Sequence, residues 1–233
     1  MNPLRYIQGA RLLAFTAVLF GSLANPAWSL MEYTDAQRAT IVEIVEQLQE
    51  RHYAKLDYDD QLSSQHLDNY IDGLDSSKMF LLQSDIAEFE QYRSLMDDEV
   101  QEGKVDAGFA IFNRFHQRLQ DRLDKVITTL PEAVAAMDFT VDESISLDLE
   151  NRKWAADEAE LDDRWRKQLK NQVLSLKLAD KPVDEIVPTL EKRYKNQLKS
   201  VKQYNSQDVF QIYANALTEL GVGDEAVADQ EGA

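Results

Sequence analysis

The feature that most constrains the fold is the spacing of apolar residues, which recur every three to four positions through most of residues 41–220. Such spacing places them on one side of a helix, and that side must be buried against another element. The chain has only eight glycines and five prolines in 233 residues, which is too few turn-forming residues for a sandwich or barrel of many short strands. We therefore predict an all-α fold.

Stripes and capping signals predict about seven helices. The first opens with a capping-box pattern at Thr34 and Gln37, and Ser84 is expected to cap the third. The fourth helix is the longest and should end at Pro131. Pro188 means that the sixth helix either starts later than its apolar spacing indicates or is kinked. The first four helices are expected to form one layered bundle. The expected helices cover approximately residues 34–53, 64–74, 84–102, 106–130, 161–176, 186–201 and 206–220.

The helical period disappears between the fourth and fifth expected helices. Within this stretch Ile145, Leu147 and Leu149 alternate with polar residues, which is the period of a strand. We expect an irregular arm or a short strand near residues 132–155, lying across the helices or serving as a functional arm.

The two ends of the chain differ from its middle. Residues 1–29 combine Arg5 and Arg11, an apolar run over residues 12–24 and small residues before Leu30, which is typical of a cleavable export signal. The apolar run is too short to span a bilayer, so we expect no stable membrane insertion after cleavage. We expect residues 30–220 to form the helical domain and residues 221–233 an acidic, disordered tail.

The net charge of −17 limits the partners. Binding to nucleic acid or to anionic lipid requires many basic residues on one surface, so neither is an expected partner. The longest helix carries a basic stripe, which we expect to pair with nearby carboxylates rather than to bind a partner. That stripe consists of Arg114, Arg118, Arg122 and Lys125. The same expectation holds for Lys192, Arg193, Lys195, Lys199 and Lys202.

No residue pattern indicates catalysis or metal binding. His52, His66 and His116 lack partners at metal-ligand spacing, so we interpret them as core or boundary imidazoles. The acidic clusters at residues 57–60 and 97–99 lack the glycine and final glutamate of a calcium loop. The chain has no cysteine and no serine in a known nucleophile motif. We expect no catalytic, cofactor-binding or metal-ligating residue and no cofactor.

Several segments together resemble one family, the N-terminal domain of tail-specific proteases, which are carboxy-terminal processing peptidases of the Gram-negative periplasm. Their order and spacing over residues 33–220 carry the resemblance. The later segments are Met137-Asp138-Phe139-Thr140, Trp154, Glu158-Ala159-Glu160-Leu161, Trp165, Leu174-Ser175-Leu176-Lys177-Leu178, Arg193-Tyr194-Lys195 and Ser206-Gln207-Asp208-Val209-Phe210. The earlier ones are Arg51-His52-Tyr53, Leu74-Asp75, Phe80-Leu81-Leu82 and Ser84-Asp85.

The resemblance implies a periplasmic location and a role in proteolysis. In that family the helical domain precedes a PDZ domain and a serine peptidase core with a Ser/Lys dyad, and no position here matches the dyad. After Leu220 the sequence departs from the family pattern. Without a positioned nucleophile and base there is no covalent peptidase mechanism.

Three functions remain. The first is a non-catalytic periplasmic scaffold that binds a protein partner, namely a peptidase, an adaptor or a substrate. The alternative is a truncated or split fragment of a carboxy-terminal processing peptidase. The third is hydrolysis through an unrecognised pair among the 42 acidic residues, although no constellation of the required geometry is visible.

Overall fold

The computed structural model describes residues 30–51, 58–149 and 151–220, and these residues form an all-α fold, as predicted. The described part contains eight α-helices and one 3₁₀ turn, η1 (Glu90–Tyr92), where the sequence indicated about seven helices. The helices are α1 (Asp35–Arg51), α2 (Asp60–Asp75), α3 (Gln83–Phe89), α4 (Met96–Gln101), α5 (Asp106–Ala135), α6 (Glu158–Leu178), α7 (Val183–Val201) and α8 (Ser206–Thr218). The expected export signal at residues 1–29, the expected tail at residues 221–233 and His52 lie outside the described residues.

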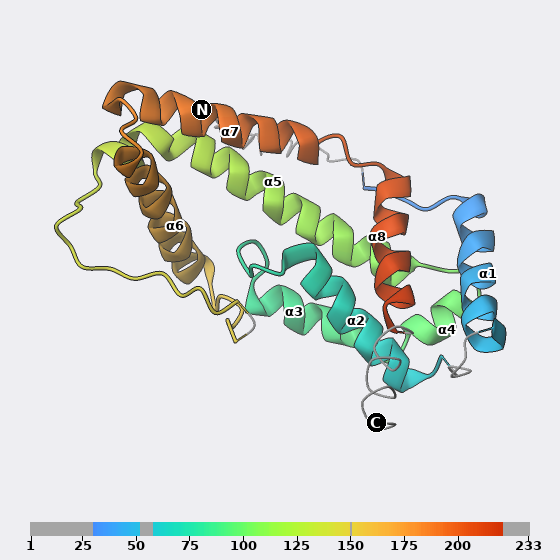
Figure 1. Cartoon of the computed structure of the whole chain (residues 1–233). Coiled ribbons are helices and arrows are strands. Elements are labelled where there is room, and N and C mark those ends of the chain that lie inside the picture. The colour runs from blue at the N-terminus through green and yellow to red at the C-terminus, as the bar shows by residue number, and fades with distance from the viewer. Residues whose placement is uncertain (1–29, 52–57, 150, 221–233) are drawn as a thin grey trace, which may run out of the picture.

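The 30-residue helix α5 is the axis of the molecule (Figure 1). At 1.5 Å per residue it is about 45 Å long. Helix α7 runs antiparallel beside it and makes the most extensive helix–helix contact of the fold. At one end α6 packs against both, and at the other end α2 and α8 pack together, with α1 against α4. One long helix therefore joins two groups of shorter ones.

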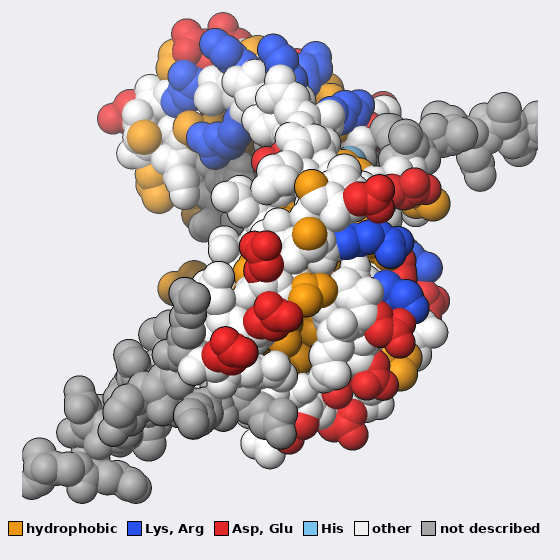
Figure 2. Space-filling view, turned by 90° about the vertical axis from the view of Figure 1, so that its right-hand side faces the viewer, with side chains coloured by type: hydrophobic (Ala, Val, Ile, Leu, Met, Phe, Trp, Pro, Cys, Tyr) orange, Lys and Arg blue, Asp and Glu red, His pale blue; other side chains and the backbone are white. Residues whose placement is uncertain are grey.

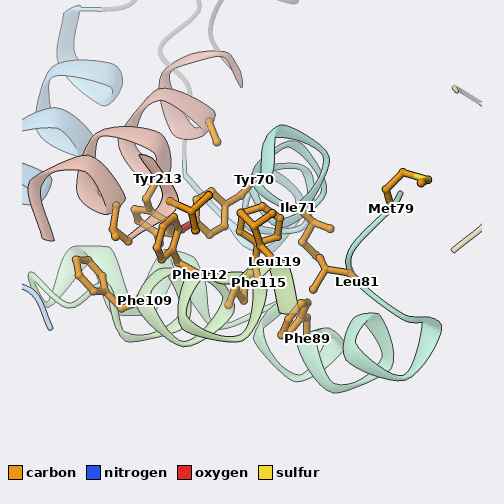
Figure 3. Close-up of a cluster of buried hydrophobic side chains, with 14 of the residues drawn as sticks. Tyr70, Ile71, Met79, Leu81, Phe89, Phe109, Phe112, Phe115, Leu119 and Tyr213 are labelled. Atoms are coloured by element: carbon orange, nitrogen blue, oxygen red, sulfur yellow. The ribbon is translucent and has the colours of Figure 1, made fainter. Parts of the chain in front are cut away.

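The aromatic core lies where α2, α5 and α8 meet (Figure 3). The rings of Tyr70 and Tyr213 meet edge to face with centroids 5.3 Å apart, and the Tyr70 hydroxyl donates to the Gly108 carbonyl at 3.0 Å. A Cβ on Gly108 would lie 2.3 Å from Cδ2 of Tyr213, so only glycine allows this approach of α5 and α8. Because α8 completes this core, the expectation that the first four helices form a bundle of their own is wrong.

A buried carboxylate shapes the turn after α2. Asp75 is 2% exposed and accepts the backbone N–H groups of Met79, Phe80 and Leu81, each at 2.9 Å. Burial raises the pKa of the Asp75 carboxyl, and these bonds oppose that rise. The turn in this way delivers Leu81 to the core and Phe80 to its edge.

The third expected helix is broken, which accounts for the extra helix. It divides into α3, η1 and α4, and it begins at Gln83 rather than after Ser84. At the break the Arg93 guanidinium donates to Ser64 Oγ at 2.7 Å and to Asp68 Oδ1 at 3.0 Å, both on α2. These bonds to α2 stabilise a bend that the apolar spacing alone does not show.

Neither proline stops its helix. Helix α5 continues through Pro131 to Ala135, so the prediction that it ends there is wrong. Helix α7 starts at Val183 and contains Pro188, which excludes the delayed start. Each proline removes one backbone donor. Fully buried Leu130 directly precedes Pro131, and fully buried Leu190 lies two residues after Pro188, so packing outweighs the lost hydrogen bonds.

The connection between α5 and α6 is an irregular arm, which confirms that expectation, whereas the alternative of a strand is wrong. In the described part of the chain the one β-type pairing is an isolated bridge between Leu82 and Ala155, where the Gln83 N–H donates to the Ala155 carbonyl at 2.8 Å. The arm leaves the helices and returns at this bridge (Figure 1). Leu147 of the arm is 89% exposed, whereas Phe139 and Trp154 pack against the core and Ala155 is fully buried.

Candidate functional site

The basic stripe of α5 forms an ionic seam, as predicted. Asp85 of α3 has no exposed side-chain surface, and it accepts Arg114 at 2.7 Å and Arg118 at 3.0 Å. Burial opposes ionisation of Asp85, but bonds from Arg118, the Leu82 N–H and Arg114 outweigh it and lower the pKa of the carboxyl. The first half of the stripe therefore fixes α3 on α5.

The second half of the seam joins α5 to α6. Arg122 is buried and binds Glu158 at 2.9 Å, and it also pairs with Asp162. Lys125 binds the same Asp162 carboxylate at 2.7 Å. All four stripe residues are thus paired with acids of this chain, which leaves the stripe a structural rather than a partner-binding role.

His66 and His116 are hydrogen-bonded inside the fold. In the buried His66 ring, Nδ1 accepts a hydrogen bond from the Tyr58 hydroxyl at 2.8 Å, and Nε2 donates to the Tyr213 carbonyl at 3.0 Å. His116 Nε2 is 2.9 Å from the Val201 carbonyl oxygen. These placements confirm the interpretation as core and boundary imidazoles. Among the described residues no group of three or more His, Cys, Asp or Glu is arranged to hold a metal ion.

A pocket of about 650 Å³ lies between α5, the arm and α6. Its apolar wall includes Val126, Met137 and Leu169. Most charged groups around it are paired: hydrogen bonds from Arg166 at 2.5 Å and Lys170 at 2.8 Å lower the pKa of the Glu143 carboxyl to about 2. The pocket is therefore an apolar hollow with a neutralised rim, which suits an apolar group of a partner.

Exposed apolar side chains gather on the same side of the fold. Nine large hydrophobic residues are exposed in the described part, and six of them belong to the arm or to the hairpin of α6 and α7. These six residues, which we name the apolar tip, are Val141, Leu147, Leu149, Leu174, Leu178 and Val183. Val141, Leu147 and Leu174 line one hollow together, and exposed apolar surface of this kind marks interaction sites. The alternation at Ile145, Leu147 and Leu149, which predicts a possible strand, instead places Leu147 and Leu149 on this exposed surface.

Charge is divided between the two groups of helices. Figure 2 shows lysine and arginine side chains gathered at the top, at the level of α7, whereas acidic side chains predominate lower down. On α7 the bases are only partly paired: Lys195 binds Glu191 at 2.5 Å, and Arg193 contacts the Gln172 amide oxygen at 3.5 Å. The expectation that these bases pair with carboxylates thus holds for Lys195 and fails for Arg193.

Some family-pattern residues have structural roles that sequence reasoning did not assign. Asp75 and Asp85 organise the start of α3 through their hydrogen bonds. The Trp165 indole N–H donates to the Met79 carbonyl at 2.6 Å, which fixes α6 to the turn after α2. Their polar groups act on backbone atoms, so spacing along the chain gave no sign of them. In the described part, no helix has the length and apolar content needed to cross a membrane.

Comparisons with known proteins identify the family. The model of the family described as "Tail specific protease N-terminal domain" matches residues 44–221. A relative, the tail-specific protease of Haemophilus influenzae, is 32% identical over 195 residues. That alignment covers 83% of this chain and 27% of the relative, so the chain spans about a quarter of that protein's length. Helical fold and sequence pattern agree, and the chain belongs to the family of tail-specific protease N-terminal domains.

Proposed function

We propose that this chain is a non-catalytic helical scaffold of periplasmic proteolysis, which acts by binding another protein. The observation that carries the proposal is the apolar tip beside the 650 Å³ pocket. Burying such residues against a partner yields about 25 cal/mol for each Å² removed from water. The partner is a peptidase, an adaptor or a substrate.

The placement of the two described histidines supports a role without catalysis. In the described part, His66 and His116 are both engaged with backbone carbonyls, and neither receives a hydrogen bond from a serine or threonine hydroxyl. Bonds from arginine and lysine lower the pKa of the Asp85 and Asp162 carboxyls, which keeps these two acids charged and unsuited to proton transfer. The reaction of the relative is therefore not assigned to residues of this chain.

The periplasmic location rests on the sequence of residues 1–29 and on the resemblance to an exported family. The absence of cysteine is compatible with an oxidising compartment but does not require one.

Site-specific photocrosslinking in cells tests the scaffold role. A photoreactive amino acid in place of Leu178, which is 77% exposed, should give adducts that mass spectrometry identifies as a peptidase, its adaptor or a protein that the peptidase degrades. The same group in place of exposed Glu43 on α1 is the matched control and should give none of these. Equal labelling at both positions, or none, contradicts the proposal.

A cleavage assay tests the absence of catalysis. The purified chain should leave unstructured peptides with apolar C-termini intact. Cleavage that disappears when one of the chain's own residues is mutated would show that the chain is an enzyme.

A further inference from the structure

A second hollow, which we name the arginine groove, lies under the arm on the side of α7. It measures about 470 Å³ and is formed by four segments: the turn after α2, the arm, α6 and α7. Its aromatic floor is Trp165 and Tyr194, whose ring centroids are 6.3 Å apart. Hydrogen bonds hold both rings, since Trp165 donates to the Met79 carbonyl and the Tyr194 hydroxyl to Gln172 Oε1 at 3.1 Å. The floor is thus rigid before any ligand binds.

The charge of the arginine groove is opposite to that of the chain. Its charged lining residues are Arg152 and Arg193, and no acidic residue lines it. Arg152 donates at 2.7 Å to the carbonyls of Ser77 and Ser146, and Arg193 contacts only the Gln172 amide. Neither guanidinium meets a carboxylate within the described residues. In a chain of net charge −17, an apolar groove with two uncompensated arginines is complementary to an anionic, partly apolar ligand.

The upper wall of the arginine groove is backbone that pairs with no other backbone segment, although the Ser146 carbonyl accepts Arg152. Residues 141–148 of the arm make no backbone–backbone hydrogen bond to any other described residue. Leu147 extends from this wall and is 89% exposed. On the opposite side, Gln168 and Gln197 line the groove, and their amides have no partner within the described chain. Backbone that belongs to no helix or strand, beside apolar and amide side chains, suits a peptide backbone better than a compact small molecule.

We propose that the arginine groove binds an extended peptide segment of a partner protein, in which apolar side chains alternate with glutamate or aspartate. The apolar side chains lie on Trp165, Tyr194 and Leu147, and a side-chain carboxylate pairs with Arg193. Arg152 is a positioning residue that links the arm to the turn after α2 through Ser146 and Ser77. This proposal deepens the proposed function by naming the chemistry of the partner.

Fluorescence anisotropy with purified chain and a labelled nine-residue peptide tests the proposal. In the probe leucine alternates with glutamate, and both ends are blocked. We expect saturable binding of one probe per chain, with at least tenfold weaker binding when glutamine replaces glutamate. The absence of saturation up to about 1 mM would overturn the proposal. Tighter binding of the glutamine peptide with a free C-terminus would also overturn it, because the recognised group would then be a terminal carboxylate.

Three variants locate the site. R193E should bind the glutamate probe at least tenfold more weakly than the original chain does. It should bind a probe with lysine in place of glutamate more tightly than the original chain does. K192E makes the same charge change on the neighbouring exposed residue of α7, outside the groove lining, and should change affinity less than threefold. L147D alters a side chain outside the core and should also weaken binding at least tenfold.

Equal effects of R193E and K192E would show that the probe is attracted by the general charge of α7, and would overturn the proposed site. If the probe instead drives sedimentation of a dimer, or the unlabelled chain self-associates through Leu147, the occupant is a second copy and the proposal is wrong. The crosslinking experiment tests the apolar tip in cells, and the anisotropy experiment tests the arginine groove of the purified chain. Failure of one proposal can therefore be distinguished from failure of the other.

Discussion

The buried imidazole of His66 makes the stability of the fold depend on pH. Burial lowers the pKa of His66 to about 4 from the usual 6.5, and the hydrogen bond to the Tyr213 carbonyl only partly opposes that shift. Between these two pH values the unfolded chain binds a proton that the native chain does not. Stability from this group is therefore complete above pH 6.5 and is lost as the pH falls through 4. At 1.36 kcal/mol per pKa unit, the loss is about 3 kcal/mol.

Other groups around the imidazole determine how this effect must be measured. Tyr58, Tyr70 and Tyr213 surround the ring, and burial raises the pKa of all three, so they stay neutral in this pH range. Asp97 and Glu99 of α4 lie near the Tyr58 hydroxyl. Burial raises the pKa of Glu99, so its contribution to stability grows as the pH falls and opposes that of His66. Measuring the free energy of unfolding of the natural chain alone therefore does not separate the effect of His66 from that of Glu99.

The comparison with H66Q isolates the imidazole. Glutamine keeps a donor for the Tyr213 carbonyl but does not titrate. Urea unfolding followed by far-UV circular dichroism should show the natural chain losing about 3 kcal/mol more than H66Q between pH 7 and pH 4. Parallel pH profiles of the two proteins would refute the reasoning, because they would mean that His66 is protonated at no cost in the folded state.

Three further predictions concern the core, the seam and the expected export signal. G108A should lower the free energy of unfolding in urea by roughly 3 kcal/mol, because its Cβ would lie 2.3 Å from the Tyr213 ring. The Cβ of G73A meets no atom within 4 Å, so this variant should stabilise α2 by about 0.5–1 kcal/mol. Equal effects of the two variants would disprove the close contact. D85N should lower the free energy of unfolding by about 2 kcal/mol, which is less than for a fully buried ion pair because both arginine partners are partly exposed. A fully stable D85N would mean that the first half of the seam does not hold α3. Mass spectrometry of the exported protein should give a chain beginning at Leu30, and retention of Arg5 would contradict cleavage.

The sequence predicted the fold wherever one apolar stripe decides a helix. On α2 the residues Leu67, Tyr70 and Ile71 are buried, as their spacing indicated. It failed where a tertiary contact outweighs a local signal, as at Pro131, which packing of α5 overrides, and at Arg93, whose bonds to α2 stabilise the bend. Local rules describe what a segment prefers alone, and neither contact is local.

The candidate sites were less accessible to sequence reasoning. Pairing of the α5 stripe was predictable, because the first half of the chain is rich in acids, although its partners Asp85 and Glu158 were not identifiable. The arginine groove was not predictable at all, since its lining comes from four segments between Ser77 and Gln197. Only the fold shows that Arg152 and Arg193 line one groove.

The position of α8 determines when this protein can fold. Tyr213 fills the space between α2 and α5, and its carbonyl receives the His66 ring. A ribosome that has not yet released residues 206–218 therefore has a nascent chain whose aromatic centre is open and whose early helices lack their counterpart. Folding of the helical domain therefore waits until residues 206–218 have left the ribosome, and the early helices cannot complete their core during the synthesis of residues 35–205.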